Sequence, residues 1–340
     1  MSAPPPLTTP ASQDGRLIAM VAVLVPAVVA LALWAFAWPA ARTAPRDLPV
    51  GVAGPAAAAG PLAQQLNARE GAFEVHRYAD EDAARAAIEE RTVYGAIVAT
   101  PRGPKLLTAT AASPVVAQLL EQAVREQTPK GAAAVPAVDV VPAPAADPRG
   151  SALGSSVLPL AIAGVAAGSL VTLRGPRGPR AVVALLAAAA SVGVVAAALA
   201  HSWLGILTGN WWAEAGVLGL STLAVSATVA GLGALLGPAG IGVGALLMVL
   251  LGNPFSGVTS APRLLPEPVG FIGQLLPPGA GGSLLRSVSF FDGAQAAAPA
   301  LTLGAWIALG LTAVLFGGLA RGRGASAARP AERREAEPVG

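Results

Sequence analysis

The chain contains no cysteine, and it has little charge and few aromatic residues. Without thiols it cannot form disulfides or thiolate metal sites. Only 12% of its 340 residues are charged, whereas a soluble globular protein carries about 25%. Its two histidines, His76 and His201, have no partner at metal-ligand spacing, so we expect both to be ordinary surface or interface residues. The shortage of charge indicates a chain that lies largely in lipid.

Sequence motifs for catalysis are absent as well. No G-x-x-x-x-G-K-[ST] segment is present to bind ATP phosphates, and no G-x-S-x-G segment is present to hold a nucleophilic serine. Basic residues occur at the ends of apolar segments and form no basic face with interleaved aromatics, which argues against nucleic acid as a partner. We therefore predict no catalytic residues, no metal site and no cofactor, and we predict that the chain is not an enzyme.

Long apolar segments make up most of the chain. Residues 17–38 form an uncharged run of 22 residues, long enough as a helix to cross a hydrocarbon core of ~30 Å. A secretory signal peptide is the alternative, but its apolar region is usually about 7–15 residues long, so we predict an uncleaved anchor. Five further segments follow, at about 153–173, 181–200, 215–236, 239–258 and 299–320. The predicted fold class is an α-helical polytopic membrane protein with six transmembrane helices.

Residues 47–149 differ from the rest because they hold 12 of the 19 acidic residues. Asp80 and Ser113 each precede a helical pattern as an N-cap residue. Strands are predicted at 48–54, 72–78, 93–100 and 105–111, and helices at 61–70, 80–92 and 113–127. This alternation predicts a small α/β domain between the first and second transmembrane helices. A stretch rich in proline and alanine, at 132–149, leads back to the apolar segments.

The distribution of arginine predicts the orientation. Three arginines and no acid occur at 174–180, and five arginines occur at 321–340. Cytoplasmic loops carry an excess of Lys and Arg, so the tails 1–16 and 321–340 are predicted to be cytoplasmic. The domain at 47–149 is then extracytoplasmic, as is a loop at 259–298 inside the five-helix region 153–320.

Two arginines oppose this orientation, because Arg42 and Arg46 then lie outside. A long translocated domain follows them, which weakens the objection. The tryptophans agree with the orientation, since all are expected toward the outer face: Trp34, Trp38, Trp203, Trp211, Trp212 and Trp306. Ala, Gly, Pro and Arg dominate the composition, which suggests a high-GC bacterial genome. We predict a multi-pass protein of the bacterial plasma membrane with both termini cytoplasmic.

The fifth apolar segment breaks at "GNPFSG", residues 252–257. Residues 240–252 number only 13, about 20 Å of helix, so the span either starts earlier, at 237–240, or continues through 253–257. Broken backbone at membrane depth is tolerated where it lines a cavity, and transporters place such breaks on substrate paths. The candidate path residues are Asn253, Pro254, Ser256 and Gly257. Alternatively, a short tilted helix simply leaves the membrane here.

The predicted outer loop at 259–298 is apolar but interrupted by Pro and Gly. We expect short helices that lie in the interface or dip into it. Four charged residues are candidates in this loop: Arg263, Glu267, Arg286 and Asp292. Arg263 and Glu267 are four residues apart and could pair on a helical turn. We expect these charges to be solvated; the alternative is contact with an exported substrate or with the outer domain.

The predicted spans contain no ionisable residue, and Glu214, the nearest acid, is expected at the interface. Coupling to protons through this chain is therefore poorly supported, whereas a permease driven by a separate ATPase needs no such residue. Two G-x-x-x-G pairs occur in the spans, Gly164 with Gly168 and Gly240 with Gly244. They could pack helices within the chain or dimerise two chains.

Several segments together resemble a known family. These are the anchor, "DLPVGVAG", "DPRG" at 147–150, "GNPFSG", "LLPEPVGFIGQLLPPGAG" and "FFDG". In these segments, over about 17–320, the chain resembles the ABC-2-type transporter permeases, near the actinobacterial phage-infection-protein (YhgE/Pip-like) and DUF3533 membrane proteins.

The resemblance implies the permease subunit of an exporter that moves an apolar or amphiphilic substrate outward. It implies a separate cytoplasmic ATP-binding subunit and a homo- or heterodimer of permeases, with membrane lipid around them. The alternative is a non-transporting membrane protein whose outer domain binds a ligand, a cell-wall component or a phage. A membrane-embedded enzyme is the least supported hypothesis, because no nucleophile, metal-ligand set or carboxylate pair is expected at membrane depth.

Overall fold

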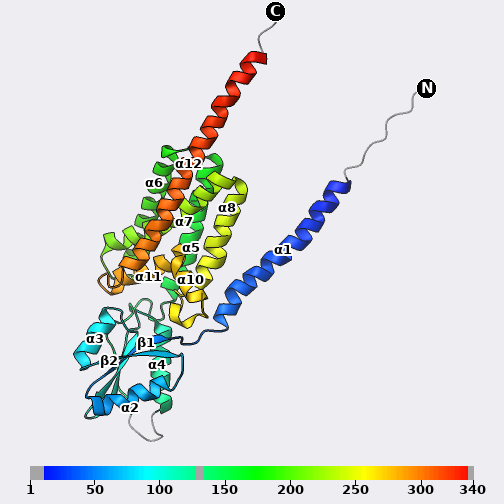
Figure 1. Cartoon of the computed structure of the whole chain (residues 1–340). Coiled ribbons are helices and arrows are strands. Elements are labelled where there is room, and N and C mark those ends of the chain that lie inside the picture. The colour runs from blue at the N-terminus through cyan, green and yellow to red at the C-terminus, as the bar shows by residue number, and fades with distance from the viewer. Residues whose placement is uncertain (1–10, 128–133, 336–340) are drawn as a thin grey trace, which may run out of the picture.

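The computed structural model describes residues 11–127 and 134–335, with side-chain environments for 15–127 and 134–317. A helical bundle lies above a smaller unit built on a β-sheet (Figure 1). The ends of the predicted tails, at 1–10 and 336–340, lie outside the described residues, as do residues 132–133 of the Pro/Ala stretch. The two parts correspond to the predicted division of the chain.

Six helices of the described chain are long and apolar enough to cross a membrane. Their ranges are Gly15–Ala40, Ser151–Arg174, Pro179–Trp203, Trp211–Leu236, Pro238–Phe255 and Ala297–Gly317. They belong to α1 (Ala11–Ala40), α5 (Ser151–Arg174), α6 (Pro179–Ala197) with η1 (Ala198–Trp203), α7 (Trp211–Leu236), α8 (Pro238–Ala245) with η2 (Leu246–Gly252) and α9 (Asn253–Phe255), and α12 (Ala297–Glu335). Six helices long and apolar enough to span a membrane, at about the predicted positions, are confirmed.

The described start of α1 and the described end of α12 both lie at the far end of the molecule, away from the sheet (Figure 1). Since α5 begins next to the sheet and six spans alternate in direction, the turn at 175–178 lies at that far end too. The tryptophans gather instead toward the sheet-side end, where Trp306 on α12 donates to the carbonyl of Leu275 over 2.7 Å. The arginine-rich turn and the tryptophans thus occupy opposite ends, as one orientation in a membrane requires.

The sheet has five strands in the order β2-β1-β3-β4-β5. The strands are β1 (Leu48–Ala53), β2 (Phe73–Tyr78), β3 (Gly95–Thr100), β4 (Gly103–Thr108) and β5 (Ala137–Asp139), and the helices are α2 (Ala56–Asn67), α3 (Glu81–Glu89) and α4 (Pro114–Gln127). β1 pairs in parallel with β2 and β3, the β3–β4 hairpin is antiparallel, and β4 pairs in parallel with β5. The first four strands were predicted and β5 was not, because "AVD" is a three-residue strand within the Pro/Ala stretch.

Local sequence explains where the helices of this unit begin. The Asp80 carboxylate accepts the N–H of Ala83 over 2.9 Å and caps α3. The Ser113 hydroxyl accepts the N–H of Val116 over 3.2 Å at the start of α4. Both predicted caps are confirmed, and each satisfies a backbone donor that the first helical turn leaves free.

The segment that follows the fifth span packs on both faces of this sheet. On one face, Leu264 is fully buried with residues of β1, α2 and α4, including Val50 and Leu120. On the other face, Phe291 packs with α3 and with Val98 of β3. Residues 259–298 therefore join the sheet unit to the bundle and are not a free loop.

Helix α7 is the centre of the bundle, because 78% of an 18-residue apolar stretch within it is buried. Its neighbours approach it closely through glycines: a Cβ at Gly164 of α5 would lie 2.7 Å from the Cβ of Val225, and one at Gly168 would lie 2.6 Å from the carbonyl oxygen of Ser226. On α8, a Cβ at Gly244 would lie 3.1 Å from the Cα of Val229. The G-x-x-x-G pairs thus pack helices within the chain, the first of the two predicted alternatives.

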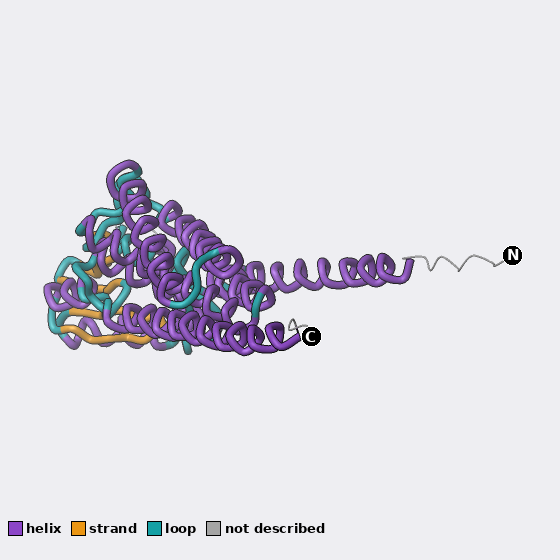
Figure 2. The backbone as a smooth tube through the Cα atoms, turned by 90° about the horizontal axis from the view of Figure 1, so that it is seen from above, coloured by secondary structure: helices purple, strands orange, loops and turns teal. Residues whose placement is uncertain are grey.

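Helix α1 stands apart from the other spans and points away from them (Figures 1 and 2). Every residue from Gly15 to Leu31 is exposed. Contact is made only near its carboxyl end, where Trp34 stacks on Trp38 with ring centroids 5.8 Å apart. Trp34 also meets the ring of Phe255 edge-on at 6.3 Å. In a membrane, lipid would surround most of α1.

Candidate functional site

The structure shows where the fifth span begins and where it ends. Helical backbone begins at Pro238 and continues to Phe255, so the span both starts earlier and continues through "NPF". The widened π-helical turn η2 lies directly before Pro254, and such insertions are common where a helix is distorted at a functional site. The resulting 18 residues give about 27 Å of helix.

The broken segment is a junction between α1, η2 and the two short helices α10 (Val269–Leu275) and α11 (Pro277–Phe290). Ser256 is buried, and its carbonyl accepts the Gln274 amide over 2.7 Å. Its hydroxyl donates to the carbonyl of Asn253 over 2.6 Å. Gly257 has φ +66°, and a Cβ there would lie 2.7 Å from the nitrogen of Pro262. The segment leaves the helix in a tight, glycine-dependent turn.

The structure brings only part of the predicted loop site together. Arg263 and Glu267 are exposed and line one cleft, but they form no ion pair with each other among the described residues, because η3 (Pro262–Leu264) ends before Glu267. Asp292 is exposed beside Phe291. Arg286 is 5% exposed, so the expectation that it is solvated was wrong. Proline and glycine let α11 pack tightly enough to bury it.

Arg286 and Arg91 form a basic junction between the bundle and the sheet unit. The Arg286 Nη2 donates to the carbonyl of Val258 over 3.0 Å, while its Nε has no partner. Arg91, from the end of α3, donates to the Ser283 carbonyl over 3.1 Å and also contacts the Ser287 hydroxyl. Burial lowers the pKa of Arg286 to about 10, and the positive charge of Arg91 acts in the same direction. Both guanidiniums are therefore charged at neutral pH.

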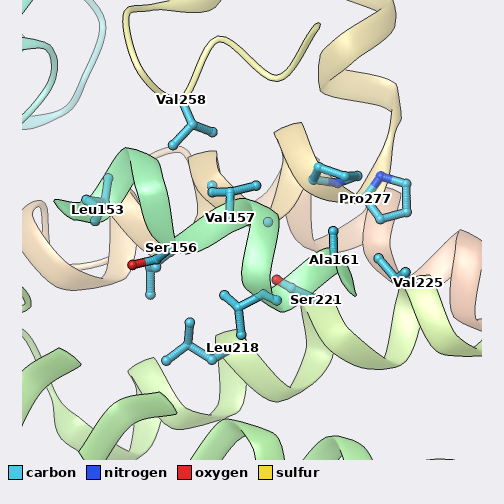
Figure 3. Close-up of a pocket in the computed structure, with 14 residues that line it drawn as sticks. Leu153, Ser156, Val157, Ala161, Leu218, Ser221, Val225, Val258 and Pro277 are labelled. Atoms are coloured by element: carbon cyan, nitrogen blue, oxygen red, sulfur yellow. The ribbon is translucent and has the colours of Figure 1, made fainter. Parts of the chain in front are cut away.

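Two apolar cavities lie at the sheet-side end of the bundle. The small cavity, of about 30 Å³, is enclosed by α5, α7, α11 and Val258. Figure 3 shows its lining, in which Val157 of α5 lies among Val258, Leu218 and Ser221. The large cavity, of about 400 Å³, lies between α5, α6, η1 and α7. Both cavities share Leu153, Ser156, Leu160, Leu218 and Leu285, so they adjoin one another.

The large cavity suits an apolar or amphiphilic molecule. Its volume falls in the range of pockets that hold small ligands. Exposed Leu199 of η1 and Leu204, the residue after η1, are part of its lining. Ser156 contributes a hydroxyl, which already donates to the carbonyl of Ala152 over 2.8 Å and keeps acceptor capacity. The path candidates at 253–257 are not among the residues that line either cavity, although the adjacent Val258 lines the small one.

A hydrogen-bonded pair of a buried glutamate and a partly exposed histidine lies next to residues that line the large cavity. Glu214 of α7 is fully buried, and its Oε2 lies 2.7 Å from Nδ1 of His201 on η1. Its Oε1 accepts the N–H of Gly209 over 2.8 Å. An ionised carboxylate can only accept, so a histidine with Nδ1 protonated fits this contact. From the sequence, Glu214 was expected at the interface and His201 without a metal-ligand partner; the structure adds that Glu214 is buried and that the two side chains pair.

Nothing in the linear sequence indicates that His201 and Glu214 contact each other. They are 13 positions apart and on different helices, and the loop between η1 and α7 folds them together. Asn210 at the N-cap of α7, which accepts the N–H of Ala213 over 3.0 Å, is the one local cue, because it starts α7 before Glu214. That cue places Glu214 inside the span, in its first turn.

Together, the six apolar helices are consistent with a polytopic helical membrane protein that carries an attached sheet unit. Comparison of the chain with protein-family models, with curated proteins and with solved structures gave no match.

Proposed function

We propose that this protein is the permease subunit of an exporter that moves an apolar or amphiphilic substrate outward across a bacterial plasma membrane. The observation that carries the proposal is the large cavity, because it is lined by residues of the candidate spans α5, α6 with η1, and α7. An amphiphile in the bilayer could reach this cavity sideways, past Leu199 and Leu204. The family resemblance stated above supports the same function.

In this proposal the sheet unit is extracytoplasmic and covers the exit of the path. Positive residues favour the cytoplasmic side, which puts Arg174, Arg177 and Arg180 inside, at the end of the bundle away from the sheet. α11 touches both cavities and also carries Arg286, so it connects the path to the sheet unit. A movement of the sheet unit would therefore be transmitted through α11 to the wall of the cavities.

A separate ATPase would supply the energy, because the chain has no P-loop of its own. Its contact face in this proposal is the end of the bundle away from the sheet, where the turn 175–178 and the far end of α12 lie. Permease halves of this kind work as homo- or heterodimers, so a second permease chain is part of the proposal.

Filling the large cavity is expected to abolish export. Ala196 lines this cavity, and Ala196→Phe would occupy part of its 400 Å³. Ala198→Phe is the matched control, because Ala198 is exposed on the same helical segment and does not line the cavity. Efflux of fluorescent lipid and drug-like amphiphiles from cells that overexpress each variant measures the effect. Equal efflux from both variants, at equal protein levels, would show that the substrate does not pass through the large cavity.

The ATPase partner is tested by affinity purification of the tagged protein from its native membrane in mild detergent. We expect a stoichiometric P-loop ATPase and ATP hydrolysis in the purified complex. A clean isolation without any ATPase would contradict this energy source. The buried His201–Glu214 pair would then direct attention to proton-coupled transport, since ionisable groups inside a bundle often serve as proton relays.

A further inference from the structure

We propose that a cleft beside α1 binds the phosphate of an anionic glycerophospholipid, whose acyl chains lie between α1 and α10. The cleft has a volume of about 460 Å³ and is lined by Arg46, which follows α1, and by residues between Pro262 and Gln274. This site is separate from the large cavity. The inference does not depend on the protein being an exporter.

Backbone hydrogen bonds hold the walls of this cleft together. The N–H of Ala44 donates to the carbonyl of Leu264, and the N–H of Arg46 donates to the carbonyl of Arg263, both over 3.0 Å. The Arg46 guanidinium donates to the carbonyls of Leu264 and Arg42, each over 2.8 Å. Arg46 is therefore fixed in place as part of the wall and positions Arg263 beside it.

The charges of the cleft favour an anion. Arg46 and Arg263 outnumber the one carboxylate in the lining, Glu267. Arg263 is exposed, and among the described residues it forms no side-chain hydrogen bond and no ion pair. A third guanidinium, that of Arg42, lies nearby over the ring of Trp38, 5.4 Å from its centroid. Guanidinium groups match phosphate geometry, so a phosphate is the anion that this cleft suits best.

The surfaces beside the cleft are apolar, which selects a lipid over a free phosphate. On α10, Phe271 is 69% exposed and Leu275 is 48% exposed. Helix α1, which leads to Arg46, exposes its apolar side chains along most of its length. A basic cleft next to exposed apolar side chains suits an anionic amphiphile. It also gives a reason for Arg42 and Arg46 to follow the first span despite the positive-inside rule.

The test measures lipid binding to the purified full-length protein by native mass spectrometry. Phosphatidylglycerol is expected to bind more tightly than phosphatidylcholine. Arg263→Gln is expected to weaken phosphatidylglycerol binding about fivefold, as loss of about 1 kcal/mol from one basic contact predicts. Glu267→Gln removes a repelling carboxylate and is expected to tighten binding, a gain that misfolding cannot produce. The control Arg69→Gln removes an exposed charge after α2 and is expected to change nothing.

Three results would overturn the proposal. One is equal binding of the two lipids by the unaltered protein. Another is unchanged phosphatidylglycerol binding in both Arg263→Gln and Glu267→Gln. The third is displacement of the bound lipid by glycerol phosphate at equal concentration, which would make the cleft a site for a free phosphate and assign no role to the apolar side chains.

Discussion

Gly310→Ala is expected to destabilise the helical bundle by about 2–3 kcal/mol, in the range measured for overpacked cores. A Cβ at Gly310 of α12 would overlap the backbone of α7 at Ala227 and would lie 2.7 Å from the nitrogen of Thr228. Backbone atoms cannot move aside as a flexible side chain can, so α12 must shift away from the central helix. The apparent Tm of the detergent-purified protein should fall by roughly 5 °C.

The matched control is Gly304→Ala, two turns earlier on α12. A Cβ there meets nothing within 4 Å, and alanine favours helix over glycine by about 1 kcal/mol. We expect the Tm of this variant to stay the same or rise slightly. A similar fall in Tm for both variants would show that the contact with α7 does not control the stability of α12, because a Cβ at Gly304 meets nothing.

Glu214→Ala is the second substitution with a large expected effect. It removes a fully buried carboxylate that holds both His201 and the N–H of Gly209. Breaking a buried pair by removing one partner costs about 3–5 kcal/mol, because the remaining group stays buried and uncompensated. Since His201 is partly exposed, we expect the lower end, about 3 kcal/mol, measured as a lower Tm and faster proteolysis of the loop at 204–210.

Glu214→Gln is the conservative control, because its amide oxygen can still accept the N–H of Gly209. We expect it to retain most of the stability lost by Glu214→Ala. In a double-mutant cycle with His201→Ala, the two alanine substitutions should be non-additive by at least about 1 kcal/mol. Additive losses would mean that the 2.7 Å contact between the two side chains contributes nothing to stability.

The positions of the secondary structure elements followed from local patterns. Uncharged runs predicted the six spans, and capping residues such as Asp80 and Ser113 predicted the starts of α3 and α4. β5 was not predicted, because a strand of three residues is too short to show the alternating pattern of a strand within a Pro/Ala-rich stretch. Its pairing partner β4, more than 25 residues earlier, is what makes it a strand.

The candidate site was predicted far less completely. The end of the fifth span near Gly257 was anticipated, because glycine acts on the backbone locally, whereas the helix continues past Pro254 to Phe255. The expectation of a solvated Arg286 was wrong, and the burial of Glu214 against His201 was not predicted. Burial of a charge depends on which distant groups meet it, here Val258 for Arg286 and His201 for Glu214.

By itself, the sequence determined that this chain has six spans, a small α/β unit after the first of them and an excess of arginine at one end, because length, hydropathy and charge act locally along the chain. Only the tertiary structure decided that α7 lies at the centre of the bundle, that residues 259–298 pack on both faces of the sheet, and that cavities lie beneath it. These features depend on contacts between helices that are far apart in sequence. Such contacts are set by how closely glycine lets two backbones approach, and that distance has no local signature.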